Sequence, residues 1–76
     1  MKKQIWLRVK TEQDEEMLKQ IFEGFEFHFG TKKEFPVVVD LNEKKVWRVE
    51  SASVCGAYLN LGGKIKESVK SLNFGF

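Results

Sequence analysis

Apolar and polar side chains alternate along both arms of residues 37–50, a pattern that predicts a β-hairpin. The apolar positions are Val37, Val39 and Leu41 on the first arm and Trp47 and Val49 on the second. Antiparallel neighbours present same-face residues to each other, so the two apolar sets are expected to meet on one side of a sheet.

A three-residue loop at positions 43–45 satisfies this rule, because it sets Leu41 opposite Trp47 and Val39 opposite Val49. On the other face the same register places Asp40 against Arg48, an ion pair worth roughly 0.2–1 kcal/mol. A two-residue loop would instead put Arg48 opposite Val39 and break the pattern.

The predicted loop has no glycine for the left-handed backbone position that such loops usually need. Asn42 is the nearest residue that tolerates that conformation.

Residues 4–10 also alternate and predict a half-buried strand, with Ile5, Leu7 and Val9 on its apolar face. Trp6 lies on the polar face beside Arg8. Either a helix or crossing loop covers this ring, or Arg8 stacks on it, or the ring is exposed for a partner.

Thr11 is a typical helix N-cap, and the acidic residues after it suit the positive end of a helix dipole. The helix is expected to end near Gly24. Its buried stripe consists of Met17, Leu18, Ile21, Phe22 and Phe25. From Phe25 the period becomes two, so Phe25, Phe27 and Phe29 predict a second strand that carries three rings on one face.

Residues 51–63 fit a short helix that begins after Ser51, although residues 58–61 also alternate like a strand. Residues 64–72 repeat Ile65, Val69 and Leu72 at helical spacing and predict a short amphipathic helix. Residues 73–76 form an aromatic tail that is expected to fray.

These elements predict one α+β domain over residues 1–76, in the order β-α-β-β-β, a short helix or loop, then α. We expect a mainly antiparallel sheet packed on the helices. The predicted core face of the sheet contains Ile5, Leu7, Val9, Val37, Val39, Leu41, Trp47 and Val49.

A 76-residue chain has a thin core, and this one holds seven Phe, two Trp and one Tyr. The single Cys55 excludes an internal disulfide, and one His with one Cys argues against zinc, so no metal or cofactor is expected. Oligomerisation is the remaining source of extra stability, which makes a homodimer a candidate. The single cysteine, together with no signal-peptide or membrane-span pattern, predicts a cytoplasmic protein.

The sequence shows no catalytic constellation, and we expect no enzyme activity. His28 is predicted on the outward face of a strand, with nothing to place it beside Cys55. Acidic residues 12–16 suit a solvated helix start better than an acid–base pair or a face for a basic partner. The segment from Gly62 to Lys64 lacks the earlier glycine and the following Ser or Thr of a phosphate-binding loop.

Sequence-independent nucleic-acid binding is the alternative function. Its candidate residues are Lys32, Lys33, Lys44, Lys45, Lys64, Lys66 and Lys70. Setting the first strand and residues 51–63 aside, the order helix, three antiparallel strands, helix resembles the double-stranded-RNA-binding domain. In that family a lysine-rich start of the second helix meets phosphates, and residues 63–66 occupy the corresponding position here. They lack the family's run of adjacent lysines and the alanines that follow it.

The leading hypothesis is a non-enzymatic protein–protein interaction module of the inhibitor or adaptor type. Small proteins that phages encode against host or defence proteins belong to this class. Aromatic and Arg side chains dominate interface hot spots. The candidate partner-binding residues are therefore Trp6, Arg8, Phe35, Phe74 and Phe76.

Overall fold

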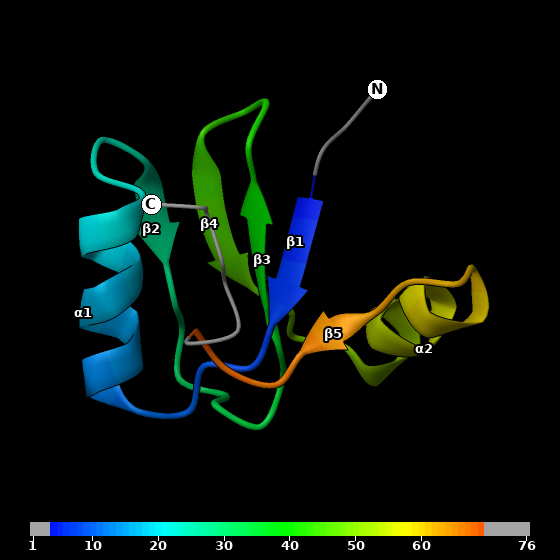
Figure 1. The fold of residues 1–76 in the computed structure, drawn as a ribbon. Helices are drawn as coiled ribbons and strands as arrows, with labels where there is room; N and C mark the ends of the chain where they lie inside the picture. Colours follow the sequence, from blue (N-terminus) through cyan, green and yellow to red (C-terminus); the bar gives the residue numbers. More distant parts are fainter. Residues whose placement is uncertain (1–3, 70–76) are drawn as a thin grey trace.

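Five strands form one mixed sheet in the order β2-β4-β3-β1-β5 in the computed structural model, which describes residues 4–69 (Figure 1). The strands are β1 (Gln4–Leu7), β2 (Glu26–His28), β3 (Val37–Asp40), β4 (Lys45–Arg48) and β5 (Ile65–Lys66). The helices are α1 (Glu12–Ile21) and α2 (Ala52–Asn60). The predicted α+β class is confirmed. The sheet is less antiparallel than expected, because β3 runs antiparallel to β1 and β4 whereas β2 is parallel to β4 and β5 to β1.

Helix α1 begins where the sequence predicts. The hydroxyl oxygen of Thr11 accepts a hydrogen bond from the backbone N–H of Asp14 at 3.1 Å, and acidic residues occupy the first turn. At the other end the N–H of Phe22 donates to the carbonyl of Leu18 at 2.9 Å. Gly24 follows with a φ of 91°, a left-handed conformation that ends the helix at little cost for glycine.

The core on the α1 side of the sheet gathers apolar residues from nearly every element. Its fully buried members include Leu7, Leu18 and Val37, and Phe25, Phe27 and Phe29 pack against them as predicted. A second, smaller cluster lies on the opposite face, where Trp6, Val38 and Val49 are packed against residues of α2. Strand β3 lies between the two clusters and is therefore buried on both faces.

The predicted hairpin exists, but its predicted register is wrong. Val39 faces Val46, Val38 faces Trp47, and Asp40 faces Lys45. Trp47 and Val49 consequently lie on the opposite face from Val37 and Val39, not with them. The sequence argument assumed that only one face of this hairpin is buried, whereas both faces of β3 are.

The connection between β3 and β4 has four residues, 41–44, instead of the three predicted at 43–45. A carboxylate oxygen of Asp40 accepts the backbone N–H groups of Asn42 and Glu43, each at 3.0 Å, and so holds the start of this loop. The left-handed position is taken by Lys44, with a φ of 56°, and not by Asn42.

Arg48 pairs with Glu15 of α1, not with Asp40 as predicted. Its Nη2 lies 3.3 Å from the Glu15 carboxylate, and its side chain is only 1 % exposed. Its Nε and Nη1 donate to the carbonyls of Phe29 (2.6 Å), Val9 (2.7 Å) and Phe35 (2.9 Å). Burial lowers the pKa of Arg48, and the charge of Glu15 opposes that shift. The guanidinium thus joins β4 to α1, to the end of β1 and to the segment after β2.

The helix predicted over residues 64–72 is wrong for the part that the structure describes. Ile65 and Lys66 form β5, which pairs with Trp6 and Leu7 of β1. The N–H of Arg8 then donates to the carbonyl of Lys66 at 2.9 Å. Pairing of the open edge of β1 satisfies its backbone groups, and this outweighs the helical spacing of a few apolar residues. Leu72 and the predicted tail at 73–76 lie outside the described residues.

The topology also departs from the double-stranded-RNA-binding domain. The strands after α1 do not form a simple antiparallel meander, because β2 lies at the sheet edge, parallel to β4. Residues 65–66, which the resemblance places near the start of the second helix, are a strand. The predicted short helix over residues 51–63 does exist as α2, and it begins after Ser51.

Candidate protein-interaction surface

Helix α2 is attached to the sheet mainly by one aromatic stack. The ring of Tyr58 lies parallel to that of Trp6, with centroids 3.8 Å apart and planes within 3°. The stack leaves Trp6 only 6 % exposed, which confirms that a helix covers this ring. Tyr58 and Cys55 are the α2 residues that pack against the second cluster.

The turn after α2 is shaped to fit Tyr58. A side chain at Gly63 would overlap the Tyr58 ring, because its Cβ would fall on the edge of that ring. The hydroxyl of Tyr58 also donates to the carbonyl of Lys64 at 3.2 Å, and the N–H of Gly63 donates to the Tyr58 carbonyl at 3.0 Å. Tyr58 is therefore held between Trp6 on one side and the backbone at Gly63.

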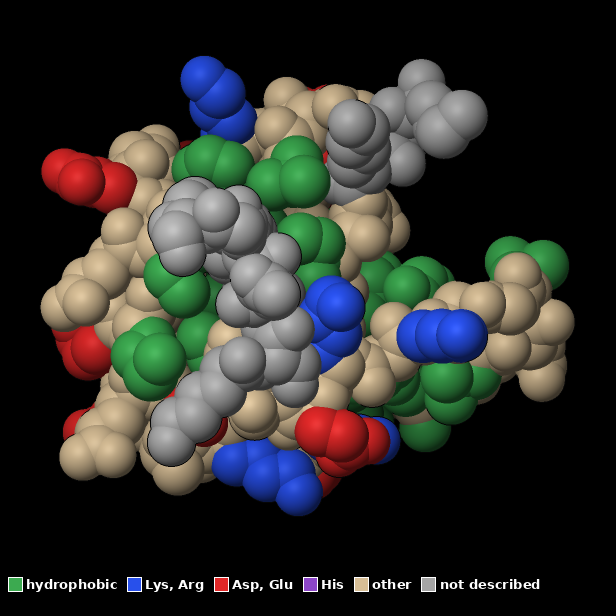
Figure 2. Space-filling view, in the orientation of Figure 1, with side chains coloured by type: hydrophobic (Ala, Val, Ile, Leu, Met, Phe, Trp, Pro, Cys, Tyr) green, Lys and Arg blue, Asp and Glu red, His purple; other side chains and the backbone are tan. Residues whose placement is uncertain are grey.

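The rest of α2 is unusually apolar for an exposed helix. No residue of α2 is buried, and residues 51–63 contain no charged side chain over thirteen positions. By contrast, five of the ten residues of α1 are charged. Figure 2 shows acidic side chains along the α1 side at the left of the view and none over α2 at the right. A helix that is apolar on all sides is normally buried.

The exposed apolar residues of α2 are not spread evenly around it. Val54, Ala57 and Leu61 follow at helical spacing and form one side, which we term the α2 flank. Val54 is 51 % exposed and Leu61, at the end of the helix, is 88 % exposed. Leu59 is also 48 % exposed, but it lies five residues, or about 140°, around the helix from Val54.

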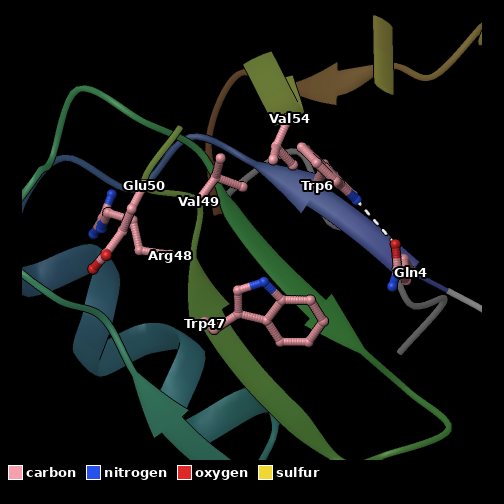
Figure 3. A pocket seen from close by; sticks show the side chains of 7 residues that line it. All are labelled: Gln4, Trp6, Trp47, Arg48, Val49, Glu50 and Val54. Carbon is pink, nitrogen blue, oxygen red and sulfur yellow. Dashed lines mark hydrogen bonds between the residues drawn. The ribbon is translucent and has the colours of Figure 1, made fainter. Parts of the chain in front are cut away.

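A hollow of ≈ 430 Å³ adjoins the α2 flank. It lies on the same face of the sheet as α2, over the part of that face that α2 does not cover. It is lined by Gln4, Trp6, Trp47, Arg48, Val49, Glu50 and Val54. Figure 3 shows the half-buried ring of Trp47 over β4, with Val54 and Trp6 on the α2 side. Arg48 and Glu50 are directed away from Trp47.

Two of the polar side chains that line the hollow, Gln4 and Arg48, are already engaged, and the third, Glu50, is directed away from Trp47. The side chain of Gln4 donates to Asp40 at 3.5 Å and accepts from Trp6 Nε1 at 3.3 Å, while the guanidinium of Arg48 is enclosed on the α1 side. A small-molecule site usually has a few polar groups that converge on the ligand. This hollow offers apolar surface instead, which suits a protein side chain.

A second, wider hollow of ≈ 550 Å³ lies over the start of α1 and is lined by Glu12, Gln13, Glu15 and Glu16. All four residues come from the first one and a half turns of one helix, so this is an acidic helix surface and not a cleft between elements. The Glu15 carboxylate is already paired with Arg48, and it lies 3.7 Å from the ammonium of Lys33.

The predicted partner-binding residues that the structure describes differ in how much surface they offer a partner. Trp6 offers a partner little area because Tyr58 covers it, and Phe35 is half-buried in the same cluster. Arg8 is partly exposed, 3.9 Å from the carboxylate of Glu67. Phe74 and Phe76 lie outside the described residues. Binding at all five residues stays a prediction.

The lysines of the nucleic-acid alternative are dispersed. Lys32 and Lys33 precede β3, whereas Lys44 and Lys45 follow it, so the two pairs lie at opposite ends of that strand. Lys64 and Lys66 are exposed at β5, and Lys70 lies outside the described residues. The six described lysines thus lie at both ends of β3 and near β5, and nucleic-acid binding stays a prediction.

Candidate catalytic groups are also separate. His28 forms an exposed pair with Glu26 at 3.0 Å, and Cys55 is half-buried on α2. The hydrogen bond with His28, and then the charges of His28 and Lys45, lower the pKa of Glu26. Within residues 4–69, no three His, Cys, Asp or Glu side chains are grouped as a metal site would require. Neither helix there has the length and apolarity needed to cross a bilayer.

Sequence reasoning missed the α2 flank and assigned Trp47 to the core. The signal that could have found the flank is the stretch of thirteen uncharged residues at 51–63, in a chain that is 32 % charged. Comparison of the chain with protein-family models, curated proteins and solved structures finds no match.

Proposed function

We propose that this protein is a non-enzymatic protein–protein interaction module of the inhibitor or adaptor type, which binds through the α2 flank and the adjoining hollow. The observation that carries the proposal is an exposed helix with no charged residue and no buried one. Exposed apolar surface of this kind, next to polar surroundings, is typical of interaction sites.

The flank and the hollow supply the parts of an interface core. Full burial of a Val or Leu side chain contributes about 1.5–3 kcal/mol of free energy. Because Val54 and Leu61 are largely exposed, a partner that covers them would gain much of this free energy. Trp47 supplies a large ring, the residue type most enriched in hot spots. Because Trp6 is fixed beneath Tyr58, the floor of the hollow is already ordered before a partner binds.

Affinity capture with two matched variants tests this proposal. Val54→Lys places a charge on the α2 flank, and Leu59→Lys places the same charge on the other side of the same helix at nearly equal exposure. We expect the tagged wild-type protein and Leu59→Lys to retain one defined protein from nuclease-treated lysate, and Val54→Lys to lose it. Circular dichroism establishes that both variants are folded.

Two results contradict the proposal. Equal capture by Val54→Lys and Leu59→Lys would show that the partner does not use the α2 flank. Capture that disappears after nuclease treatment would favour the lysine residues and nucleic acid instead, since that binding depends on phosphate contacts.

A further inference from the structure

We infer that the partner bound by the α2 flank is a second copy of this chain, so that two α2 helices pack antiparallel across a two-fold axis. This inference rests on the proposed function and names its partner. It is drawn from the shape of the surface, from its lack of charge, and from the two charged residues at its ends.

The surface contains both a projection and a hollow that can receive it. Leu61 projects at the end of α2, and the hollow between Val54 and Trp47 lies beside the same helix. A two-fold axis pairs each residue with its counterpart in both directions. With the axis near Ala57, Leu61 of the second copy lies against Val54 and enters the hollow over Trp47, and the reciprocal contact forms at the same time.

Ala57 is the residue on which two such helices would cross. It lies midway along the α2 flank, and its small side chain is exposed. The axes of packed helices lie about 8–10 Å apart, depending on the side chains at the contact, and small side chains allow the closer approach. A larger residue at this position would separate the helices and keep Leu61 out of the hollow.

The absence of charge favours self-association. When a surface packs on an identical copy across a two-fold axis, each charge near the axis faces a charge of the same sign. Such like-charge contacts are destabilising. Residues 51–63 avoid this problem because none of them is charged. Elsewhere the chain carries a net charge of +2 and several lysine pairs, which would repel across a two-fold axis.

The charges at the two ends of the helix are complementary in the antiparallel arrangement. Glu50 lies just before α2, Lys64 lies just after it, and both are exposed. The midpoint between Glu50 and Lys64 along the chain is residue 57. The midpoint between Val54 and Leu61 lies within half a residue of the same position. Two-fold pairing about Ala57 therefore sets Glu50 of each copy against Lys64 of the other, and also opposes the two helix dipoles.

Sedimentation equilibrium over a range of protein concentrations tests the inference. We expect the wild-type protein and Leu59→Lys to reach twice the 8.9 kDa mass of one chain. Val54→Lys, Leu61→Lys and Ala57→Phe should each raise the dissociation constant by about tenfold or more, because each change occurs twice in the dimer.

A charge exchange separates the antiparallel contact from any effect on folding. Glu50→Lys and Lys64→Glu should each weaken the dimer, and the double variant should restore it, because the exchanged charges are again opposite. Failure of the double variant to restore association would overturn the antiparallel arrangement.

Failure of the inference is distinguishable from failure of the proposed function. A wild-type protein that stays monomeric overturns the dimer. If another protein is then captured in a way that depends on Val54, the proposed function stands. If the monomer also captures nothing that depends on Val54, both are overturned. A dimer that is unaffected by Val54→Lys and Leu61→Lys also overturns the inference, because its interface lies elsewhere.

Discussion

Tyr58 stacks on Trp6 with ring centroids 3.8 Å apart, and this contact links the uncharged helix α2 to the first strand of the sheet. The other α2 residue in that cluster is Cys55, which is half-buried. The position of the α2 flank relative to the hollow thus depends on a single aromatic pair and on the glycine turn that supports it.

Substitution of Gly63 by Ala should destabilise the protein. The added Cβ would overlap the Tyr58 ring and force either the ring or the turn to move. Overpacking of this kind typically costs about 1–3 kcal/mol. Urea unfolding followed by tryptophan fluorescence measures the loss, since Trp6 lies directly under the displaced ring.

Gly56 provides the matched control for this change. It lies inside α2, and a Cβ there meets nothing within 4 Å. Gly56→Ala should leave the free energy of unfolding unchanged or raise it by up to about 1 kcal/mol, because Ala is the better helix former. Equal losses for the two variants would show that the fit of Gly63 to Tyr58 is not the cause.

Replacement of Arg48 by Met should be among the most damaging single changes. It removes the buried partner of Glu15 and leaves the carbonyls of Val9, Phe29 and Phe35 without their donor. Removing one partner of a buried, hydrogen-bonded ion pair costs about 3–5 kcal/mol. Arg8→Met is the control and should cost less than about 1 kcal/mol, because Glu67 is largely exposed. Similar midpoints for the two variants in thermal unfolding would contradict this role of Arg48.

Lys44→Gly should stabilise the hairpin by up to about 1 kcal/mol. Lys44 has a φ of 56°, a left-handed conformation in which the Cβ of an L-residue is crowded. Glycine has no Cβ and adopts this conformation without that steric strain. The same substitution at Lys45 should destabilise, since Lys45 lies in β4 and is paired with Asp40 of β3. The two urea midpoints are expected to move in opposite directions from the wild-type value.

The acid dependence of stability should include a small contribution from Glu26. The His28 hydrogen bond lowers the pKa of this carboxyl in the folded state, so the unfolded chain binds its proton more readily. The contribution is present above the unfolded pKa and is lost as pH falls through the folded pKa. Urea midpoints measured across the acidic range should fall less steeply for Glu26→Gln, and also for His28→Gln, than for the wild-type protein.

Local signals predicted the elements whose structure is decided within a few residues. Thr11 caps α1 through its own hydroxyl, and Gly24 ends that helix by its backbone conformation. The three alternating Phe residues of the second strand are likewise a local pattern, and they pack into the core as expected.

Contacts between residues distant in the sequence determine the features that the sequence analysis predicted wrongly or missed. The register of the hairpin depends on the two N–H groups that Asp40 holds and on a second buried face, neither of which follows from alternation. The Ile65 segment became a strand because the edge of β1 was available to it. The stack of Tyr58 on Trp6 decides which side of α2 faces the sheet, and the α2 flank is on a side that stays exposed.

The place of β2 at the sheet edge has a consequence for the order of folding. Among residues 4–69, β2 pairs only with β4, which is synthesised after it, and β3 comes between the two in the chain. The hairpin is the sheet's pairing of lowest sequence separation, so its loop-closure entropy is the smallest. During synthesis, β2 has no strand to join until β4 has left the ribosome. We therefore expect the addition of β2 to the sheet to follow formation of the hairpin.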